Sequence, residues 1–449
     1  MNTNNYQKNN TNNDDTILLS ETKSVCPICL KRIDAAYVAW GNQVFLDKTC
    51  EQHGEFSAPI WDSPMGFLMW KMRVSQEIST DEGDCPNNCG ICEKHIQETC
   101  CVLLEVTQRC NLECPICFAS SAMESSIKDP CIETIAEWYD MLMQNGGPFN
   151  IQLSGGEPTM RDDLPEIIRI GFDKGFSFFQ LNTNGLRIAN EDGYIEKLAI
   201  AGLSTVFLQF DGFSDKANIA LRGRNLIEEK RRAIDRCRDA HVGVVLVPTI
   251  MKGANDEEVG EILKFASEQM PIVRGVHFQP ISLFGRHMAE GDIRITFPEL
   301  FDSIECQTEG RVKRSHFSPS NAEHPLCGFH VDYKIKDGVW ELLKSNKDAC
   351  SCGISSAQSR TITARKWKAP DKTFVAEKSE MYEVSSFDDF IAERQNTTLA
   401  ISGMAFQDAY TMDLNRLKRC YIHIVSQDGK LVPFCSYNLS SDSGETLYR

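Results

Sequence analysis

Short apolar runs alternate with longer amphipathic stretches between about Cys101 and Ser282. Between the first two runs, Ile132, Ile135 and Tyr139 recur at helical spacing. This alternation predicts six βα units around a parallel sheet. The runs with the length and composition of buried strands are Val102–Val106, Asn150–Leu153, Phe176–Leu181, Thr205–Phe210, Val242–Val247 and Val276–Ile281.

Polar or glycine-rich loops follow most of these predicted strands. They read T-Q-R-C-N-L-E-C-P-I-C, S-G-G-E-P, N-T-N-G, D-G-F and T-I-M-K-G-A-N-D. The carboxyl ends of parallel strands meet at one rim, where α/β folds bind their ligands. We therefore expect an active site at this rim.

The chain outside the predicted core is rich in cysteine and less regular. Residues 24–98 precede the core, which spans 99–290, and residues 295–449 follow it. Both flanking segments are predicted to be metal-binding lobes. The Asn-rich residues 1–20 are predicted to form a disordered, solvated tail.

Composition and charge exclude several classes of protein. The chain has 449 residues, of which 42% are hydrophobic and 24% charged, as in ordinary globular proteins of two or three domains. The formal net charge of −16 disfavours binding to phosphate backbones, so no nucleic-acid partner is expected. The best apolar window, Val242–Met251, is shorter than a membrane span and contains Pro248.

Nineteen cysteines are the exceptional feature of the composition. The N-terminus lacks the basic and apolar regions of a secretory signal. Disulfides are rare in the reducing cytoplasm. The sequence thus predicts a cytoplasmic protein whose cysteines bind metal or carry out redox chemistry.

The spacing C-x3-C-x2-C occurs twice. Three thiolates within eight residues can hold three irons of a cubane iron–sulfur cluster and leave the fourth iron open. A zinc knuckle, the alternative, needs a fourth ligand that neither motif has nearby. The first set, Cys110, Cys114 and Cys117, follows the first predicted strand. The second set, Cys85, Cys89 and Cys92, precedes that strand and would form an auxiliary cluster completed by His95 or a distant cysteine.

The remaining cysteines suggest two more metal sites. A C-P-I-C pair followed by C-E-Q-H is typical of a mononuclear zinc or iron site. Near the C-terminus, a predicted hairpin with Asp428-Gly429 at its turn brings two cysteines to the same open end. The candidate ligands are Cys26, Cys29, Cys50 and His53 for the mononuclear site, and Cys327, Cys350, Cys352, Cys420 and Cys435 for a further auxiliary site.

The first three-cysteine loop and the S-G-G-E-P loop one βα unit later resemble the radical S-adenosylmethionine (radical SAM) superfamily. The resemblance implies a partial (βα)6 barrel in which Cys110, Cys114 and Cys117 hold a 4Fe-4S cluster. S-adenosylmethionine would chelate the open iron and yield a 5′-deoxyadenosyl radical that abstracts hydrogen from an unactivated carbon. It also implies an electron donor such as ferredoxin or flavodoxin.

The resemblance further assigns residues to S-adenosylmethionine. One departure is Ile116, where the family often has an aromatic residue that contacts adenine; either Phe118 replaces that residue or Ile116 packs the ring itself. By resemblance, Gly155, Gly156 and Glu157 line the methionine amino group, Thr183, Asn184, Gln209 and Asp211 meet the carboxylate or ribose, and Arg222 pairs with the carboxylate.

Most of residues 24–440 is also similar to the tetraether lipid synthase group of this superfamily and its shorter bacterial relatives. The group has a rubredoxin-like metal site and auxiliary 4Fe-4S clusters, and its named member joins lipid tails by a carbon–carbon bond. Similarity to the named member implies carbon–carbon bond formation on a lipid-like substrate, whereas for the shorter relatives, which this chain resembles more, the resemblance fixes no substrate. A peptide or small metabolite is the alternative substrate, and a non-catalytic iron–sulfur electron carrier is a third hypothesis.

Overall fold

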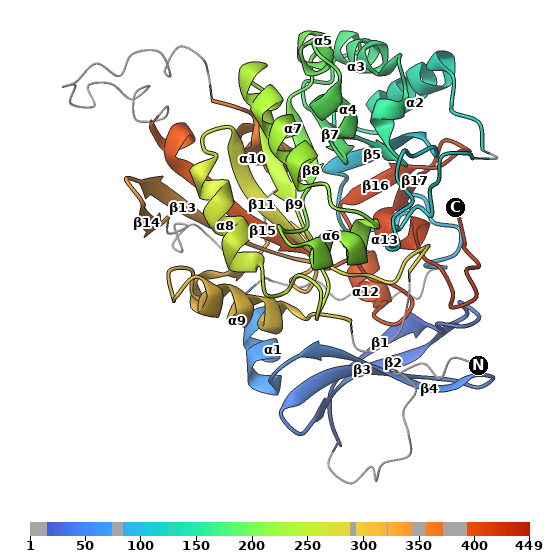
Figure 1. Ribbon diagram of the computed structural model, residues 1–449. Coiled ribbons are helices and arrows are strands. Elements are labelled where there is room, and N and C mark those ends of the chain that lie inside the picture. Colours follow the sequence, from blue (N-terminus) through green and yellow to red (C-terminus); the bar gives the residue numbers. More distant parts are fainter. Residues whose placement is uncertain are drawn as a thin grey trace.

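The computed structural model describes two packed sheets (Figure 1). It covers residues 16–73, 84–125, 127–287, 293–320, 322–343, 355–370 and 393–449.

Six parallel strands form the centre of the larger sheet and confirm the predicted βα core. They are β5 (Cys101–Thr107), β6 (Asn150–Gly155), β7 (Phe179–Thr183), β8 (Thr205–Gln209), β9 (Gly243–Val247) and β11 (Val273–Pro280), and they lie side by side in that order. The third strand begins at Phe179, three residues after the start of its predicted run. Phe176, in the preceding loop, instead packs its buried ring on Tyr139, with ring centroids 5.1 Å apart.

Amphipathic helices cover the outside of this sheet (Figure 1). Helix α2 buries Ile135, Tyr139 and Leu142 on one face, which confirms the predicted helical spacing. The outer helices are α2 (Ile132–Gln144), α3 (Leu164–Asp173), α4 (Leu186–Asn190), α5 (Tyr194–Ala201), α7 (Ile227–Asp239) and α8 (Val259–Glu268), with α6 (Asp215–Arg222) following β8 at the carboxyl rim.

The C-terminal segment extends the same sheet at the β11 edge. Strand β15 (Thr398–Met404) runs parallel to β11, and β13 (Gly328–Lys336) pairs antiparallel with β15. Short strands β12 (Ser318–Pro319) and β14 (Val339–Leu342) pair with β13. The segment was expected to be less regular, but it supplies strands that continue the barrel wall.

A second part of this segment extends the sheet at the β5 edge. Strand β16 (Ile422–Val425) lies parallel to β5 and forms an antiparallel hairpin with β17 (Leu431–Pro433). The hairpin confirms the predicted turn region, in which Gly429 has a positive φ of 75°. Helix α13 (Phe434–Tyr437), which carries Cys435, follows at once.

The N-terminal residues form a separate antiparallel sheet below the barrel in Figure 1. Its strands are β1 (Thr16–Val25), β2 (Arg32–Trp40), β3 (Gln43–Cys50) and β4 (Gly54–Trp61), followed by helix α1 (Pro64–Lys71). The predicted tail is too long, because Thr16–Ser20 belong to β1; residues 1–15 lie outside the described residues. Buried contacts join this sheet to the C-terminal segment, among them Thr22 Oγ1 donating to Asp413 at 2.6 Å.

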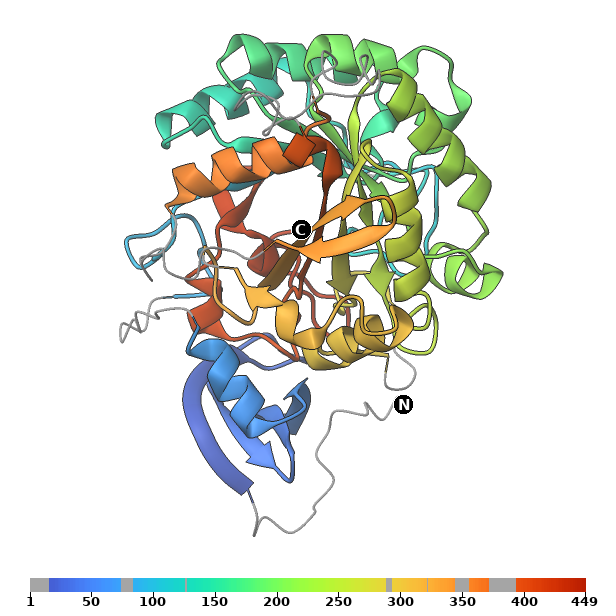
Figure 2. The same cartoon turned by 90° about the vertical axis from the view of Figure 1, so that its left-hand side faces the viewer.

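The remaining elements pack around the two ends of the barrel (Figure 2). Helix α10 (Ser356–Trp367) closes the amino end of the barrel. Its last residue lies so close to the start of β9 that a Cβ on Gly243 would be 2.4 Å from the Trp367 carbonyl oxygen. No helix in the described part of the chain is long and apolar enough to cross a membrane. The other elements are α9 (Phe297–Gln307), α12 (Leu414–Leu417), β10 (Thr249–Ile250) and the short 3-10 helices Pro158–Met160 and Arg314–His316.

Candidate active site

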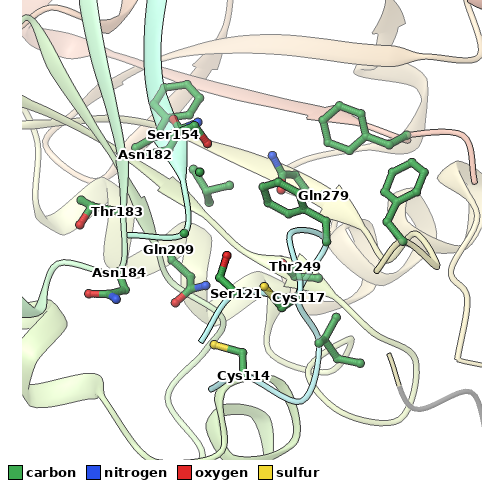
Figure 3. A pocket seen from close by; sticks show the side chains of 18 of the residues that line it. Cys114, Cys117, Ser121, Ser154, Asn182, Thr183, Asn184, Gln209, Thr249 and Gln279 are labelled. Carbon is green, nitrogen blue, oxygen red and sulfur yellow. The ribbon is translucent and has the colours of Figure 1, made fainter. Parts of the chain in front are cut away.

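The carboxyl ends of the central strands enclose a cavity of about 240 Å³ (Figure 3). Successive side chains of a strand point to opposite faces, so alternate residues near each strand end face inward. Those that line the cavity include Gln152, Ser154, Asn182, Phe207, Gln209, Val247, Thr249, His277 and Gln279. The predicted rim is therefore hollow, and most of these inward-facing side chains were not among the residues assigned from the sequence.

The loop after β5 brings Cys110, Cys114 and Cys117 to this cavity. Arg286 holds the loop: its Nε donates to the Cys114 carbonyl at 2.7 Å and its Nη2 donates to the Ser121 carbonyl at 2.9 Å. Backbone hydrogen bonds also join Arg286 to Cys117 in both directions. No sequence motif pointed to Arg286, which is more than a hundred residues from the loop.

The chemistry of the three thiols fits an iron–sulfur cluster. Burial raises the pKa of Cys110 to about 12 and also raises the pKa of Cys114. Such thiols keep their protons at neutral pH unless a metal displaces them. Beside them, the hydroxyl of Ser121 is buried and has no hydrogen-bond partner among the described residues. The three thiols thus lie at the cavity wall, where a metal cluster would displace their protons.

Gly155 and Gly156 let the end of β6 approach the cysteine loop. A Cβ on Gly155 would lie 2.0 Å from the Thr107 carbonyl oxygen, and one on Gly156 would lie 2.3 Å from the Arg109 carbonyl oxygen. Gly155 also has a φ of +118°, which side chains rarely tolerate. Glycine is required at both positions to bring the two rim loops together.

Glu157 organises the neighbouring loop from within the protein. Its carboxylate, 1% exposed, accepts hydrogen bonds from Thr159 N and Oγ1, from Thr183 Oγ1 at 2.6 Å, and from Asn184 N at 2.7 Å. Asn184 in turn donates through Nδ2 to Asn111 of the cysteine loop at 2.7 Å. Glu157, Thr183 and Asn184 all line the cavity, and their contact with S-adenosylmethionine stays a prediction.

Arg222 reaches the cavity as half of a buried ion pair. Its Nε and Nη2 donate to the two oxygens of Asp211 at 2.6 and 2.8 Å, and Nη2 also donates to Thr249 Oγ1 at 3.0 Å. The hydrogen-bonding pattern places the Gln209 amide oxygen 2.9 Å from Arg222 Nη1. The residues that line the cavity include Gln209 and Arg222, whereas Asp211 lies behind Arg222. Asp211 therefore positions Arg222 and does not reach the rim where a ribose was expected.

Both residues considered for the adenine contact line the cavity. Ile116 is 9% exposed and packs with Leu221 and Ile281. Phe118 is more exposed and packs against Phe434, with ring centroids 5.9 Å apart. The two alternatives for the missing aromatic residue thus both remain.

The predicted mononuclear site is assembled in the N-terminal sheet. The ligand atoms of Cys26, Cys29, Cys50 and His53 all lie within 4.8 Å of one another. His53 Nδ1 is 3.5 Å from Cys26 Sγ and 3.4 Å from Cys50 Sγ. Three sulfurs and one imidazole nitrogen make a tetrahedral set suited to zinc. This geometry confirms that the four residues converge.

Three cysteines of the predicted auxiliary sites lie together beside α13. Cys89 and Cys435 belong to one buried cluster that Cys85 contacts, and Ser436 Oγ is 3.4 Å from Cys89 Sγ. The Cys85 thiol lowers the pKa of Cys89 to about 7. The imidazole of His95, considered as a further ligand, lies 2.6 Å from the Cys420 carbonyl oxygen through Nε2.

Burial raises the pKa of Cys420 to about 12, and nearby Cys327 adds to this rise. Cys92 is exposed. Cys350 and Cys352 lie outside the described residues.

Comparisons with known proteins identify the family. The sequence matches the radical SAM superfamily over residues 104–266 and the HMPTM N-terminal zinc ribbon domain over residues 18–62. It is 34% identical over 475 aligned positions to the 7,8-dihydro-6-hydroxymethylpterin dimethyltransferase of Methanocaldococcus jannaschii, with 93% of each chain covered. The chain belongs to the radical SAM superfamily. As a radical SAM enzyme it uses a 4Fe-4S cluster and S-adenosylmethionine, and its zinc ribbon indicates an additional metal site.

Other radical SAM proteins are similar over part of the chain. The GTP 3′,8-cyclase of Marinobacter nauticus is 31% identical over 191 residues, which are 41% of this chain and 56% of the cyclase. Streptococcus suis SuiB, solved with its precursor peptide SuiA, aligns with a TM-score of 0.41 and 17% identity over 55% of this chain and 56% of SuiB.

Proposed function

We propose that this protein is a radical SAM enzyme that methylates a carbon of a pterin-like heterocycle. The observation that carries the proposal is the alignment with the Methanocaldococcus jannaschii dimethyltransferase over 93% of both chains. That alignment includes the zinc ribbon and the C-terminal strands as well as the core, whereas the cyclase match covers less than half of this chain.

The residues of the rim have separate roles in this proposal. When bound, the cluster and S-adenosylmethionine would supply a radical that takes hydrogen from the substrate carbon, and a second S-adenosylmethionine would donate the methyl group and leave as S-adenosylhomocysteine, with one electron from the reductant for each molecule consumed. Cys110, Cys114 and Cys117 hold the cluster. Glu157 fixes the loop that carries Asn184, and Arg222, held by Asp211, presents a cation to a carboxylate. Phe207, which lines the cavity, packs edge-on against Trp367 of α10 with ring centroids 5.9 Å apart, so α10 covers this side of the barrel.

The cavity supports a small cyclic substrate better than the lipid that the sequence resemblance implied. Two alkyl chains would need apolar walls along their whole length, but polar side chains interrupt the apolar lining of this cavity. Amides of Gln152, Asn182 and Gln279 share this space with the Phe207 ring. Burying such amides against alkyl chains would leave hydrogen bonds unmade, at a cost of about 1–3 kcal/mol each.

We also infer that Cys85, Cys89 and Cys92 hold an auxiliary 4Fe-4S cluster beside α13. Cys89 is buried and fixed through its backbone amide, which donates to Tyr448 Oη at 2.6 Å. The Tyr448 hydroxyl donates in turn to the Pro86 carbonyl, so the C-terminus holds this loop in place. Cys435 and Cys420 are the nearest candidates for additional ligands.

The proposal is tested with anaerobically reconstituted enzyme, S-adenosylmethionine, a chemical reductant and 7,8-dihydro-6-hydroxymethylpterin. We expect mass spectrometry to detect a methylated pterin with the wild type and none with the Cys110/Cys114/Cys117→Ala triple variant. Cys306→Ala, which changes an exposed cysteine on α9, is the matched control and should retain activity.

If peptides but not pterins are methylated, the substrate assignment is wrong. If S-adenosylmethionine is never cleaved although all clusters are present, the electron-carrier hypothesis replaces it.

A further inference from the structure

The apolar lining of the cavity is interrupted by a few uncharged polar side chains. Gln152 on β6, Asn182 on β7, and His277 and Gln279 on β11 face it from strand ends. Figure 3 shows Asn182 on one side of the cavity and Gln279 on the other. Uncharged polar groups on two facing walls suit a ligand that carries hydrogen-bonding groups on more than one edge.

A short network fixes the orientation of the amides on the β6–β7 wall. Gln180 Nε2 donates to Asn182 Oδ1 at 2.8 Å, and Asn182 Nδ2 donates to Gln152 Oε1 at 3.4 Å. Gln180 is 1% exposed, so its amide anchors the network from behind. Because the acceptor oxygens of Asn182 and Gln152 are engaged, this wall offers mainly N–H donors to a ligand.

The β11 wall has polar atoms without partners. The Gln279 amide has no hydrogen-bond partner in the part of the chain that the structure describes. His277 Nδ1 lies 2.9 Å from Ser402 Oγ, which leaves Nε2 to the cavity. Burial lowers the pKa of His277 to about 4, so the ring is neutral at pH 7. Phe207 adds a flat apolar face, with its ring centroid 6.0 Å from that of His277.

Both charged side chains that line the cavity are already engaged. Glu157 accepts hydrogen bonds from Thr159, Thr183 and Asn184, and Arg222, which is paired with Asp211, is the cation that the proposed function assigns to the carboxylate of S-adenosylmethionine. A phosphate group entering this space would meet no free cation among the described lining residues. Its desolvation would be uncompensated, which is unfavourable for a doubly charged group.

We propose that Gln279 and His277, facing the Gln152–Asn182 pair, recognise the hydrogen-bonding edges of an uncharged heteroaromatic ring, and that the site rejects phosphate esters of that ring. This inference rests on the proposed function and names the residues that select its substrate. It also sets an order of reactions: any phosphoryl transfer to the substrate's hydroxymethyl group must follow this enzyme.

Equilibrium binding to the reconstituted holoenzyme tests the inference without turnover. The probes are 6-hydroxymethylpterin and its phosphate ester, each followed by pterin fluorescence. We expect the phosphate ester to bind at least about tenfold more weakly than the alcohol. Gln279→Met, of similar volume, should weaken binding of the alcohol about 5- to 150-fold, since a buried hydrogen bond is lost. Gln144→Met, on the exposed end of α2, should bind like the wild type.

Iron content and S-adenosylmethionine binding serve as folding controls for each variant. If Gln279→Met loses iron, His277→Phe, which keeps a flat ring but removes its nitrogens, takes its place. Equal affinity of wild type and variant, or equal affinity for alcohol and ester, would overturn the inference alone. If the wild type binds neither pterin, the proposed function fails with it.

Discussion

Replacing Glu157 by Gln tests whether this carboxylate organises the rim from within the protein. In the wild type one carboxylate oxygen accepts from Thr159 N, Thr159 Oγ1 and Thr183 Oγ1, and the other accepts from Asn184 N. The amide introduced by Glu157→Gln would turn an N–H group toward one of these donors. If the amide nitrogen faces Asn184, the Asn184 N–H is left buried and unpaired.

The expected loss follows from these contacts. An unsatisfied buried N–H costs about 1–3 kcal/mol, and removing the charge weakens the remaining hydrogen bonds by about 1 kcal/mol in total. The free energy of unfolding should therefore fall by about 2–4 kcal/mol. Because Asn184 also binds Asn111 of the cysteine loop, S-adenosylmethionine binding should weaken as well.

Urea unfolding followed by tryptophan fluorescence measures the stability, and equilibrium dialysis measures S-adenosylmethionine binding. Glu166→Gln, at an exposed position in the first turn of α3, is the matched control and should change neither quantity. Unchanged stability in Glu157→Gln would refute the reasoning. Weaker binding at unchanged stability would show that the carboxylate acts on the ligand directly.

Three further predictions follow from other parts of the structure. Gly156→Ala should destabilise the fold by about 1–3 kcal/mol and reduce iron in the radical cluster, because its Cβ would clash with the Arg109 carbonyl. Gly193→Ala, which strains a φ of +73° far from the cysteine loop but meets no neighbouring atom, should retain iron; normal iron content in Gly156→Ala would contradict the reasoning. Cys50→Ala should lower the metal content by about one ion per chain without removing the radical cluster, and elemental analysis beside Cys306→Ala checks this. The stability of the wild type should rise with pH between about 4 and about 6.5, because unfolded chains protonate His277 there while the folded state does not. His277→Gln should make this rise less steep, with the remainder due to other buried histidines such as His324 and His423, whose pKa values burial also lowers; an unchanged slope would exclude His277 as a source.

The core of the fold was predictable because its signals are local. Strands buried on both faces read as continuous apolar runs, and the helices between them repeat apolar residues at helical spacing. The cysteines of the mononuclear site were predictable for the same reason, since each pair is close in sequence.

The rest depends on contacts between distant residues. Asp211 and Arg222 were both assigned to the ligand, but their mutual ion pair follows only from the turn that joins β8 to α6. The side chains of Gln152, Asn182 and His277 were missed. Successive side chains of a strand point to opposite faces of the sheet, but the sequence does not say which face lines a cavity. The β16–β17 hairpin was expected from its Asp-Gly turn, but the pairing of β16 with β5 and of β15 with β11 was missed, because it joins segments far apart in the sequence.

Deuterium transfer tests the central claim most directly. The holoenzyme would be reduced in the presence of S-adenosylmethionine and 7,8-dihydro-6-hydroxymethylpterin that carries deuterium at its carbon-bound positions. The account predicts methylated pterin together with 5′-deoxyadenosine that contains deuterium. Methylated pterin formed without any 5′-deoxyadenosine, or 5′-deoxyadenosine free of deuterium while the pterin stays unchanged, would contradict it.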